Sequence, residues 1–232
     1  MSVTSKMFSC APRVKHRTKS RESFRVSCRA VDAQEVERIF RDSGALLEGH
    51  FVLASGKHSA RYLEKFRVFE HPRVTERLCA GIVERVTAPI DVVVGPTTGG
   101  VILAHEVGRQ LGTRAAFAER EEGHPGRRFR RGHAVSAGDR VLVVDDILST
   151  GGSLAETLDA VRDAGAHVTR VAVLVDRSGG VDLGVPVEAL WTTRIDAYPP
   201  ERCPLCERGI PSVKPGTTPA GATAAKGGAR SG

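Results

Sequence analysis

The stretch Val141-Leu-Val-Val-Asp145-Asp146-Ile-Leu-Ser149-Thr150-Gly151-Gly152-Ser153 decides the fold class of this chain. Its four leading apolar residues predict a buried strand, and the pattern that starts at Leu154 predicts a helix after a short turn. The amides of such a turn, together with the helix N-terminus, favour a bound phosphate. The paired carboxylates would repel that phosphate, so we expect them to face sugar hydroxyls or a metal ion. The stretch therefore predicts a site for a phosphorylated sugar.

A second segment has the same order of strand, turn and helix. It runs Asp91-Val-Val-Val-Gly95-Pro96-Thr97-Thr98-Gly99-Gly100-Val. Two such units predict an α/β fold with a mainly parallel central sheet, helices on both of its faces, and a ligand site at the carboxyl ends of the strands. The simplest alternative is a pair of ordinary turns in which Asp and Ser cap a helix. Capping alone would not need two acids at the end of the first strand.

Length and composition divide the chain into three parts. Residues 1–30 are basic and rich in Ser, and we expect a disordered extension; a transit-type peptide, a nucleic-acid arm and an upstream start remain alternatives. Residues 31–213 are long enough for one domain with a small hood, formed mainly by 31–70 and 185–213. Residues 214–232 are dominated by Pro, Gly, Thr and Ala, and we expect disorder.

The net charge of +7 arises outside the expected domain. Residues 1–30 carry eight Lys/Arg and one acid, which leaves 26 of each sign in the remainder. A neutral domain argues against a broad nucleic-acid surface, and no apolar run is long enough to span a membrane. Five cysteines without a secretory segment favour a reducing cytoplasm. Cys203-Pro-Leu-Cys206 has half the spacing of a zinc site, but no second Cys/His pair lies at a convincing distance along the chain.

The Val141–Ser153 stretch resembles the ribose-phosphate signature of type I phosphoribosyltransferases. The resemblance implies binding of 5-phosphoribosyl-1-diphosphate, with Mg²⁺ carried by this substrate near Asp145 and Asp146, which would orient the ribose and support its developing positive charge. It also implies contacts to that substrate from Thr97, Thr98, Gly99, Gly100, Asp145, Asp146, Ser149, Thr150, Gly151, Gly152 and Ser153.

Other segments resemble orotate phosphoribosyltransferases in particular. The order Gly49-His50-Phe, Ser55-Gly56-Lys57-His58-Ser59 and Tyr62 is similar to their N-terminal hood, although Ala54 stands where a polar residue is common; by its pattern the segment predicts two strands about a turn. Asp176-Arg177 resembles the place where their arginine reaches the base carboxylate. The resemblance implies that orotate contacts Ser55, Gly56, Tyr62, Thr150 and Arg177.

The segment Glu119-Arg120-Glu121, followed by a charged loop with Arg127-Arg-Phe-Arg-Arg131, resembles their mobile catalytic loop. The resemblance implies that Arg120 is catalytic and that a homodimer shares the loop between subunits. Glu119 departs from the family's usual sign, so one of Arg127, Arg128, Arg130 and Arg131 could compensate. A solvated β-hairpin is the alternative, because charge runs are usually exposed.

Taken together, these resemblances imply a cytoplasmic transferase of pyrimidine (UMP) biosynthesis that joins phosphoribosyl to orotate and releases diphosphate. Two alternatives remain open. One is a phosphoribosyltransferase paralogue that uses another purine or pyrimidine base, and the other is a nucleotide-sensing regulator of the same fold.

Overall fold

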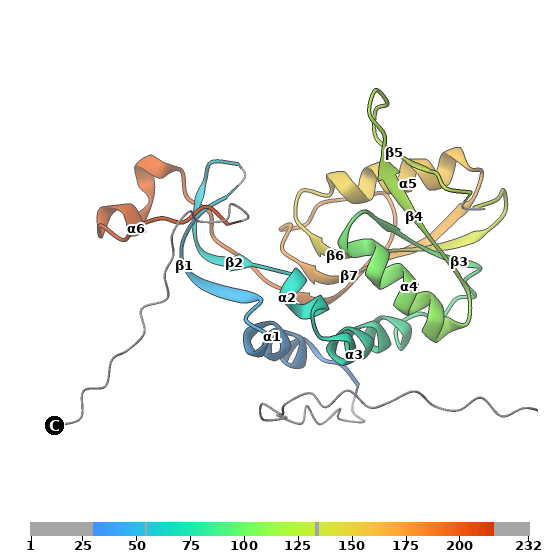
Figure 1. Cartoon of the computed structure of the whole chain (residues 1–232), viewed down its shortest axis with the longest axis horizontal. Coiled ribbons are helices and arrows are strands. Elements are labelled where there is room, and N and C mark those ends of the chain that lie inside the picture. The colour runs from blue at the N-terminus through green and yellow to red at the C-terminus, as the bar shows by residue number, and fades with distance from the viewer. Residues whose placement is uncertain (1–29, 54, 133–134, 216–232) are drawn as a thin grey trace, which may run out of the picture.

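The computed structural model describes residues 30–53, 55–132 and 135–215 of the 232-residue chain. The predictions for the basic extension, the far C-terminal tail and Ala54 therefore lie outside the described residues, apart from residue 30 and residues 214–215. The elements, in chain order, are α1 (Ala33–Asp42), β1 (Leu46–Val52), β2 (His58–Leu63), α2 (Phe66–Phe69), α3 (Pro72–Val83), β3 (Val92–Pro96), α4 (Gly99–Leu111), β4 (Arg114–Arg120), β5 (Arg127–Phe129), β6 (Arg140–Leu148), α5 (Gly152–Asp163), β7 (His167–Asp176), β8 (Val187–Thr192), the 3-10 helix η1 (Pro200–Arg202) and α6 (Pro204–Glu207) (Figure 1).

The central sheet has six strands in the order β5-β4-β3-β6-β7-β8. All neighbours are parallel except β5, which runs antiparallel to β4. Strands β3 and β6 are adjacent, with Val92 beside Val141 and Val94 beside Val143. Their carboxyl ends therefore meet at one edge of the sheet, which brings the two predicted turns together. The predicted α/β fold with a mainly parallel sheet is confirmed.

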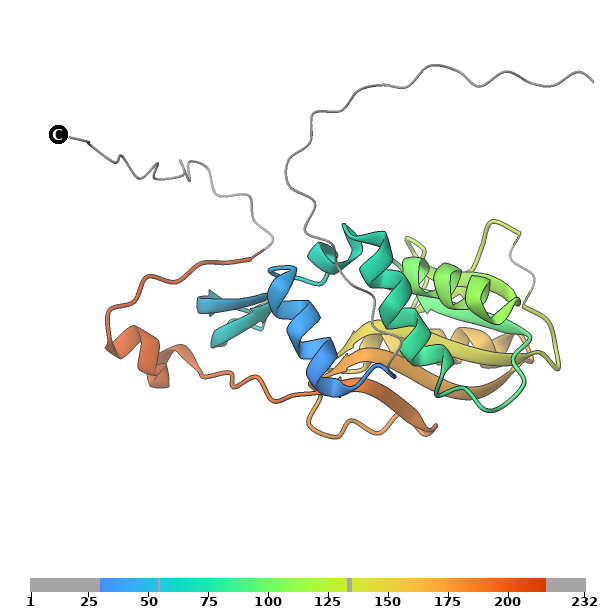
Figure 2. The ribbon, with the colours of Figure 1, turned by 90° about the horizontal axis from the view of Figure 1, so that it is seen from below.

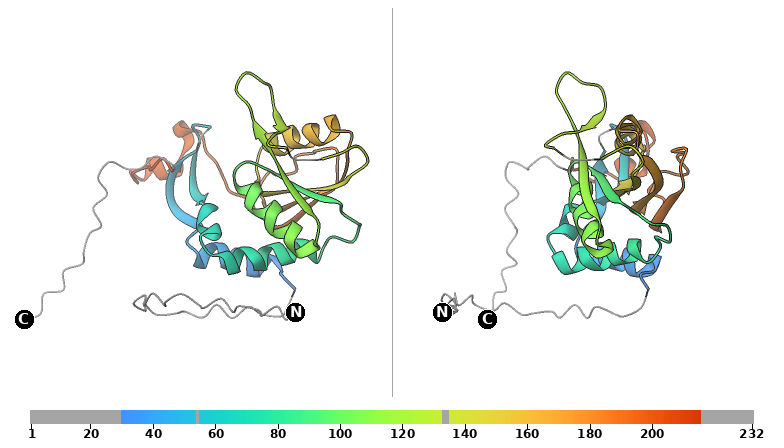
Figure 3. Two further views of the ribbon diagram at one scale, coloured as in Figure 1. Left: turned by 45° about the vertical axis from the view of Figure 1, so that its right-hand side comes forward. Right: turned by 90° about the vertical axis from the view of Figure 1, so that its right-hand side faces the viewer.

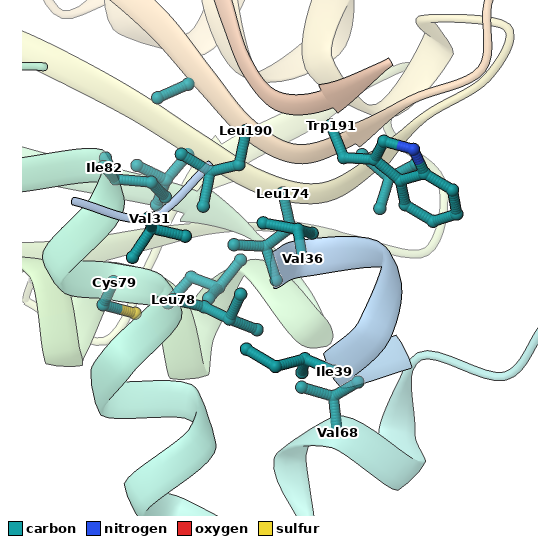
Figure 4. Packing of buried hydrophobic residues seen from close by; sticks show 14 of the residues in the cluster. Val31, Val36, Ile39, Val68, Leu78, Cys79, Ile82, Leu174, Leu190 and Trp191 are labelled. Atoms are coloured by element: carbon teal, nitrogen blue, oxygen red, sulfur yellow. The ribbon is translucent and has the colours of Figure 1, made fainter. Parts of the chain in front are cut away.

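Helices cover both faces of this sheet because its strands are apolar on both sides. One buried cluster joins α1, α3 and α4 to β3, β6, β7 and β8, and Figure 4 shows Val36, Leu78, Leu174 and Trp191 packed within it. The other cluster joins α5 to the opposite face through Leu154, Leu158 and Val161. Burying each such side chain contributes roughly 1.5–3 kcal/mol, so the two layers hold the strand ends in fixed positions.

The two segments expected to form most of the hood divide between two parts of the structure. Residues 31–70 and 185–213 are the expected span, but α1 packs in the main core, where Phe40 contacts Trp191 of β8 at a ring-centroid distance of 5.9 Å. Strand β8 is an edge strand of the central sheet. The hood proper consists of the β1–β2 hairpin, which forms its own two-stranded sheet, and residues 196–213, which pair with it.

The hood is held together by backbone pairing across a long sequence separation. Antiparallel β1 and β2 form the predicted hairpin. His58 pairs with Tyr198, and Phe51 with Val213, so the C-terminal segment runs along both strands. In Figure 2 this segment and the hairpin lie together, to one side of the central sheet.

No helix of the described residues is long and apolar enough to cross a membrane.

Candidate active site

The turn between β6 and α5 is open for an anion. Helix α5 begins at Gly152, and its N-cap Gly151 offers no side-chain cap. The first N–H groups of a helix have no intrahelical partner, and they carry the positive end of the helix dipole. Gly151 has φ +80°, and a Cβ there would lie 2.9 Å from Val181 Cγ1, so this position requires glycine. Thr150 and Gly152 are exposed, so the turn faces solvent.

The two acids at the end of β6 are both buried. Asp145 is 5% and Asp146 is 1% exposed. The Asp145 carboxylate accepts hydrogen bonds from the Asp146 N–H at 2.9 Å and the Ser153 hydroxyl at 3.0 Å. The Ser153 contact ties the acid pair to the first turn of α5. The predicted sugar site thus has its carboxylates and its phosphate turn joined directly.

The pKa values of both carboxyl groups are raised. Burial raises the pKa of Asp145, and the neighbouring charge of Asp146 raises it further. Burial also raises the pKa of Asp146, while the Lys65 ammonium opposes that rise. A buried carboxylate costs free energy unless it is paired, so the acid pair is held in a costly state. Such states are typical of functional sites.

Lys65 is a site residue that the sequence interpretation missed. Its Nζ lies 2.8 Å from Asp146 Oδ1. Lys65 immediately precedes α2 and lies two residues beyond β2, so it connects the hood side of the chain to the central sheet. The two residues are 81 positions apart, and no local pattern could have paired them.

The second turn, Thr97–Gly100, lies directly against Asp146. A Cβ on Gly99 would lie 1.7 Å from Asp146 Oδ2, so only glycine allows this close approach. Asp146 Oδ2 is buried and has no hydrogen-bond partner among the described residues. Helix α4 begins at Gly99 without a side-chain cap, and the Thr97–Thr98 peptide bond is cis. The structure therefore brings two uncapped helix N-termini to the two sides of the acid pair.

Arg127 is the loop arginine that reaches this turn. Its Nη1 donates to Thr97 Oγ1 at 2.8 Å and to the Ala118 carbonyl at 3.3 Å. Its side chain is only 9% exposed, and burial lowers its pKa while the Glu156 carboxylate raises it. The sequence interpretation left Arg127 as one of four candidates. The fold distinguishes it because β5 pairs with β4 and turns this side chain toward Thr97.

The rest of the charged loop forms an exposed β-hairpin. Strands β4 and β5 pair antiparallel and extend beyond the body of the sheet (Figure 3). Arg120 forms an ion pair with Glu156 at 2.5 Å, and Arg131 forms one with Glu119 at 2.9 Å. Glu119 serves as a partner for Arg131, which gives its unusual sign a structural reason.

Arg177 provides a half-buried cation next to the phosphate turn. It follows β7, and its backbone N–H donates to the Leu148 carbonyl at 2.9 Å, next to the phosphate turn. Its Nε is buried without a hydrogen-bond acceptor among the described residues. Burial lowers the pKa of this guanidinium, and Tyr62 raises it. The pKa of Tyr62 is in turn raised by burial and by Glu64, and lowered by Arg177 and Lys65, so these groups are neighbours.

The remaining predicted base contacts lie on the hood. Ser55 and Gly56 are exposed in the turn between β1 and β2, and Gly56 has φ +78°. Tyr62 is on β2 of the same hairpin. The structure brings Tyr62 to Arg177, and it places Ser55 and Gly56 at the far end of the strands that support Tyr62.

An α/β sheet with two uncapped helix N-termini beside paired acids is the arrangement of a phosphoribosyltransferase. Residues 68–183 match the family model "Phosphoribosyl transferase domain". An orotate phosphoribosyltransferase of Pelotomaculum thermopropionicum is 50% identical over 185 residues, which cover 79% of this chain and 96% of that relative. The chain belongs to the orotate phosphoribosyltransferase family.

Solved structures agree with this assignment. The chain is similar to the orotate phosphoribosyltransferase of Aeropyrum pernix, with a TM-score of 0.60 and 28% identity over 68% of this chain and 93% of that one. It is also similar to an adenine phosphoribosyltransferase of Rhodothermus marinus, with a TM-score of 0.55 and 21% identity over 70% of this chain and all of that one. The second likeness shows the fold alone, so the fold does not determine the base.

Proposed function

We propose that this chain transfers the phosphoribosyl group of 5-phosphoribosyl-1-diphosphate to orotate, giving orotidine 5-monophosphate and diphosphate in pyrimidine biosynthesis. A ring nitrogen of orotate forms a bond to the anomeric carbon, and the bond from that carbon to the diphosphate breaks. Positive charge develops on the ribose and negative charge on the departing diphosphate.

The environment of Arg177 supports orotate as the base. The guanidinium is half-buried beside Tyr62, and its Nε has no acceptor among the described residues, so an anionic ligand could satisfy it. A carboxylate meets this need because a guanidinium can donate two parallel hydrogen bonds to it. Orotate carries a carboxylate, whereas uracil, hypoxanthine and adenine do not. Ser55, Gly56 and Thr150 would complete the contacts to the pyrimidine.

The two uncapped turns divide the sugar substrate between them. Residues Ser149–Ser153 would bind the 5-phosphate, since the acids at Asp145 and Asp146 leave the first turn of α5 as the positive region. Residues Thr97–Gly100 would bind the diphosphate through backbone groups, supported by Arg127 through its bond to Thr97. The acids would then face the ribose hydroxyls and stabilise the positive charge of the transition state.

Mg²⁺ fits this site. Asp145 and Asp146 are opposed by one ammonium, Lys65, and Asp146 Oδ2 has no donor among the described residues. Carboxylate and phosphate oxygens are the ligands that Mg²⁺ prefers. Asp145 and Asp146 would hold the ion on the protein side, together with substrate oxygens. When bound, Mg²⁺ neutralises charge on the diphosphate and makes it a better leaving group.

The exposed β4–β5 hairpin would serve as the catalytic loop. Its closure would bring Arg120 to the diphosphate and exclude water, which otherwise hydrolyses the activated sugar. We also propose that the chain is a homodimer in which this hairpin reaches the neighbouring subunit. Light scattering after size-exclusion chromatography measures the mass. Mixing an Asp145→Asn subunit with an Arg120→Met subunit should give more turnover than either variant alone if the loop is shared, and no gain would place the loop in its own subunit.

The substrate assignment is tested by release of diphosphate. Purified full-length protein is mixed with 5-phosphoribosyl-1-diphosphate and Mg²⁺, and orotate, uracil, hypoxanthine and adenine are offered separately. We expect rapid release with orotate alone. Release with a purine, and none with orotate, would indicate a paralogue with another base. Binding of a nucleotide without turnover of any base would instead support a nucleotide-sensing regulator.

A further inference from the structure

Four metal-ligating side chains from distant parts of the sequence meet in the hood. Among the described residues, one ligand atom each from His50, His58, Cys203 and Cys206 lie within 4.8 Å of one another. The first two are on β1 and β2, Cys203 is the N-cap of α6, and Cys206 lies within α6. The acid pair and the phosphate turn contain none of these residues. The cluster therefore consists of residues that the proposed reaction does not use.

The distances between the atoms match a tetrahedral site. Zn²⁺ binds sulfur at about 2.3 Å and nitrogen at about 2.0–2.1 Å, which places tetrahedral N and S ligands about 3.6 Å apart and two N ligands about 3.3 Å apart. Cys203 Sγ and Cys206 Sγ lie 3.5 Å and 3.7 Å from His50 Nε2. Cys206 Sγ lies 3.2 Å from His58 Nδ1, and the two ring nitrogens lie 2.8 Å apart. A small outward movement of the two rings would centre an ion among all four atoms.

The tautomer of His50 is set for metal binding. Its Nδ1 lies 2.6 Å from the Ile210 carbonyl, which can only accept, so Nδ1 carries the proton. The other nitrogen, Nε2, therefore presents a lone pair to the cluster. A histidine ligand that donates its second N–H to a backbone carbonyl is the usual arrangement in metal sites. Ile210 itself is held by its N–H bond to the Leu205 carbonyl at 3.0 Å, so the whole turn is fixed.

The backbone is shaped to converge these side chains. The register of β1 shifts between Glu48 and Phe51, and His50 and Phe51 are consecutive residues that are both buried. In a regular strand one of the two would face solvent, and a bulge is the usual device that re-aims a side chain. On the other side, Cys203 and Cys206 are brought together by a single turn, with the Glu207 N–H donating to the Cys203 carbonyl at 3.1 Å.

We propose that His50, His58, Cys203 and Cys206 bind one Zn²⁺ ion, which holds residues 196–213 against the β1–β2 hairpin. Two thiolates and two imidazoles in a tetrahedron favour zinc over the hard cations. Four protein ligands leave no open position for a substrate, so the ion is structural. By fixing β2, it supports the hairpin that carries Tyr62. In the sequence, Cys203 and Cys206 supply only two of the four ligands of a zinc site. In the structure, two histidines about 150 residues earlier supply the other two.

The test measures metal content and ligand geometry in the full-length protein. The chain is purified with a reductant, and zinc is quantified by mass spectrometry; we expect one ion per chain. Replacing zinc by Co²⁺ should give the intense visible bands of a tetrahedral ion and a thiolate charge-transfer band. Because this readout needs no substitution, it remains decisive even if a ligand variant fails to fold.

Matched variants assign the ligands. Cys206→Ser and His58→Gln should each lower zinc affinity by more than the roughly 10–100-fold that loss of an outer hydrogen bond costs. Cys79→Ala and His105→Gln are the controls, because Cys79 is buried in the main core and His105 is exposed on α4; both should keep one ion. The proposal is overturned if the reduced protein binds no zinc, if Co²⁺ gives no tetrahedral spectrum, or if both ligand variants retain full binding. A Cys203–Cys206 disulfide that persists with reductant would overturn it too.

Discussion

The Lys65 ammonium lies 2.8 Å from Asp146 Oδ1, and among the described residues it is the only cation that forms an ion pair with Asp145 or Asp146. Its side chain is 33% exposed, whereas that of Asp146 is 2% exposed. A partly exposed cation thus compensates one of two adjacent buried charges. Because Lys65 belongs to the segment between the hood and the main body, we expect the position of the hood to affect the ionisation of the acids.

Lys65→Met should raise the pKa of Asp146, because the ammonium opposes the upward shift that burial causes. If ionised acids support the transition state, the acidic limb of the pH profile of kcat should move to higher pH. At pH 7 we expect kcat/KM to fall by about 10²-fold. Arg73→Met, which removes an exposed cation from α3, is the control and should leave the profile in place. An unchanged acidic limb in Lys65→Met would separate Lys65 from the chemistry.

Asp145→Asn should stabilise the substrate-free protein at high pH. The folded pKa of Asp145 is raised above the ordinary value of about 3.9, so the folded state binds more protons than the unfolded state between the two values. The free energy of unfolding of the parent therefore falls as pH rises through that window. The variant cannot ionise, so its advantage should be near zero at about pH 4 and reach roughly 1–3 kcal/mol at about pH 8.

Urea unfolding at a series of pH values measures this difference. Asp159→Asn, on the exposed face of α5, is the matched control and should show no pH-dependent gain. A stability difference that is constant with pH would contradict the buried, charged state of Asp145.

The double variant Asp145→Asn with Asp146→Asn should lose nearly all turnover while the protein stays folded. Full activity would remove both acids from the mechanism.

Arg177→Ala should weaken orotate far more than the sugar substrate. Loss of one partner of a buried charge pair costs at least about 2 kcal/mol, so we expect the KM for orotate to rise about 30-fold or more. The KM for 5-phosphoribosyl-1-diphosphate should change little. Arg194→Ala, which truncates an exposed arginine after β8, is the control. Equal increases in both KM values would argue against a contact with the base.

Arg127→Met and Arg120→Met should change different kinetic constants. Arg127 is buried against Thr97, so its loss should raise the KM for 5-phosphoribosyl-1-diphosphate by about 10-fold or more. Arg120 is exposed and paired with Glu156, so its loss should leave that KM near the parent value and lower kcat, since it would act only when the hairpin closes. Steady-state kinetics with both substrates varied separates the two. An unchanged kcat in Arg120→Met would assign this residue to the solvated face of the hairpin.

The hairpin shows where local reasoning is insufficient. The run from Arg127 to Arg131 supplies four arginines with similar sequence surroundings, and nothing in their order ranks them. Pairing of β5 with β4 turns Arg127 toward Thr97 and leaves Arg128 and Arg131 with Glu121 and Glu119. Side chains alternate between the two faces of a strand, so the register of β5 against β4 determines which arginine faces Thr97. The sequence does not specify that register.

The boundary of the hood also could not be predicted from the sequence. Its two strands follow from the apolar alternation on either side of the turn at Ser55 and Gly56. Its boundary does not, because α1 and β8 carry apolar faces that pack equally well against a hood or against a sheet. The contact between Phe40 and Trp191 assigns both elements to the main core.

The sequence by itself determined the sugar-phosphate half of this protein. Strand, acids, turn and helix follow one another within Val141–Ser153, and contiguous residues cannot be far apart in space. Only the tertiary structure decided which groups complete that half. Lys65 reaches Asp146 across 81 residues, Tyr62 reaches Arg177, and two histidines reach the Cys203–Cys206 turn. The first two meetings depend on how the hood is placed against the sheet, and the third depends on how residues 196–213 pair with the β1–β2 hairpin. Both arrangements join segments that are far apart in the sequence, so no local pattern specifies them.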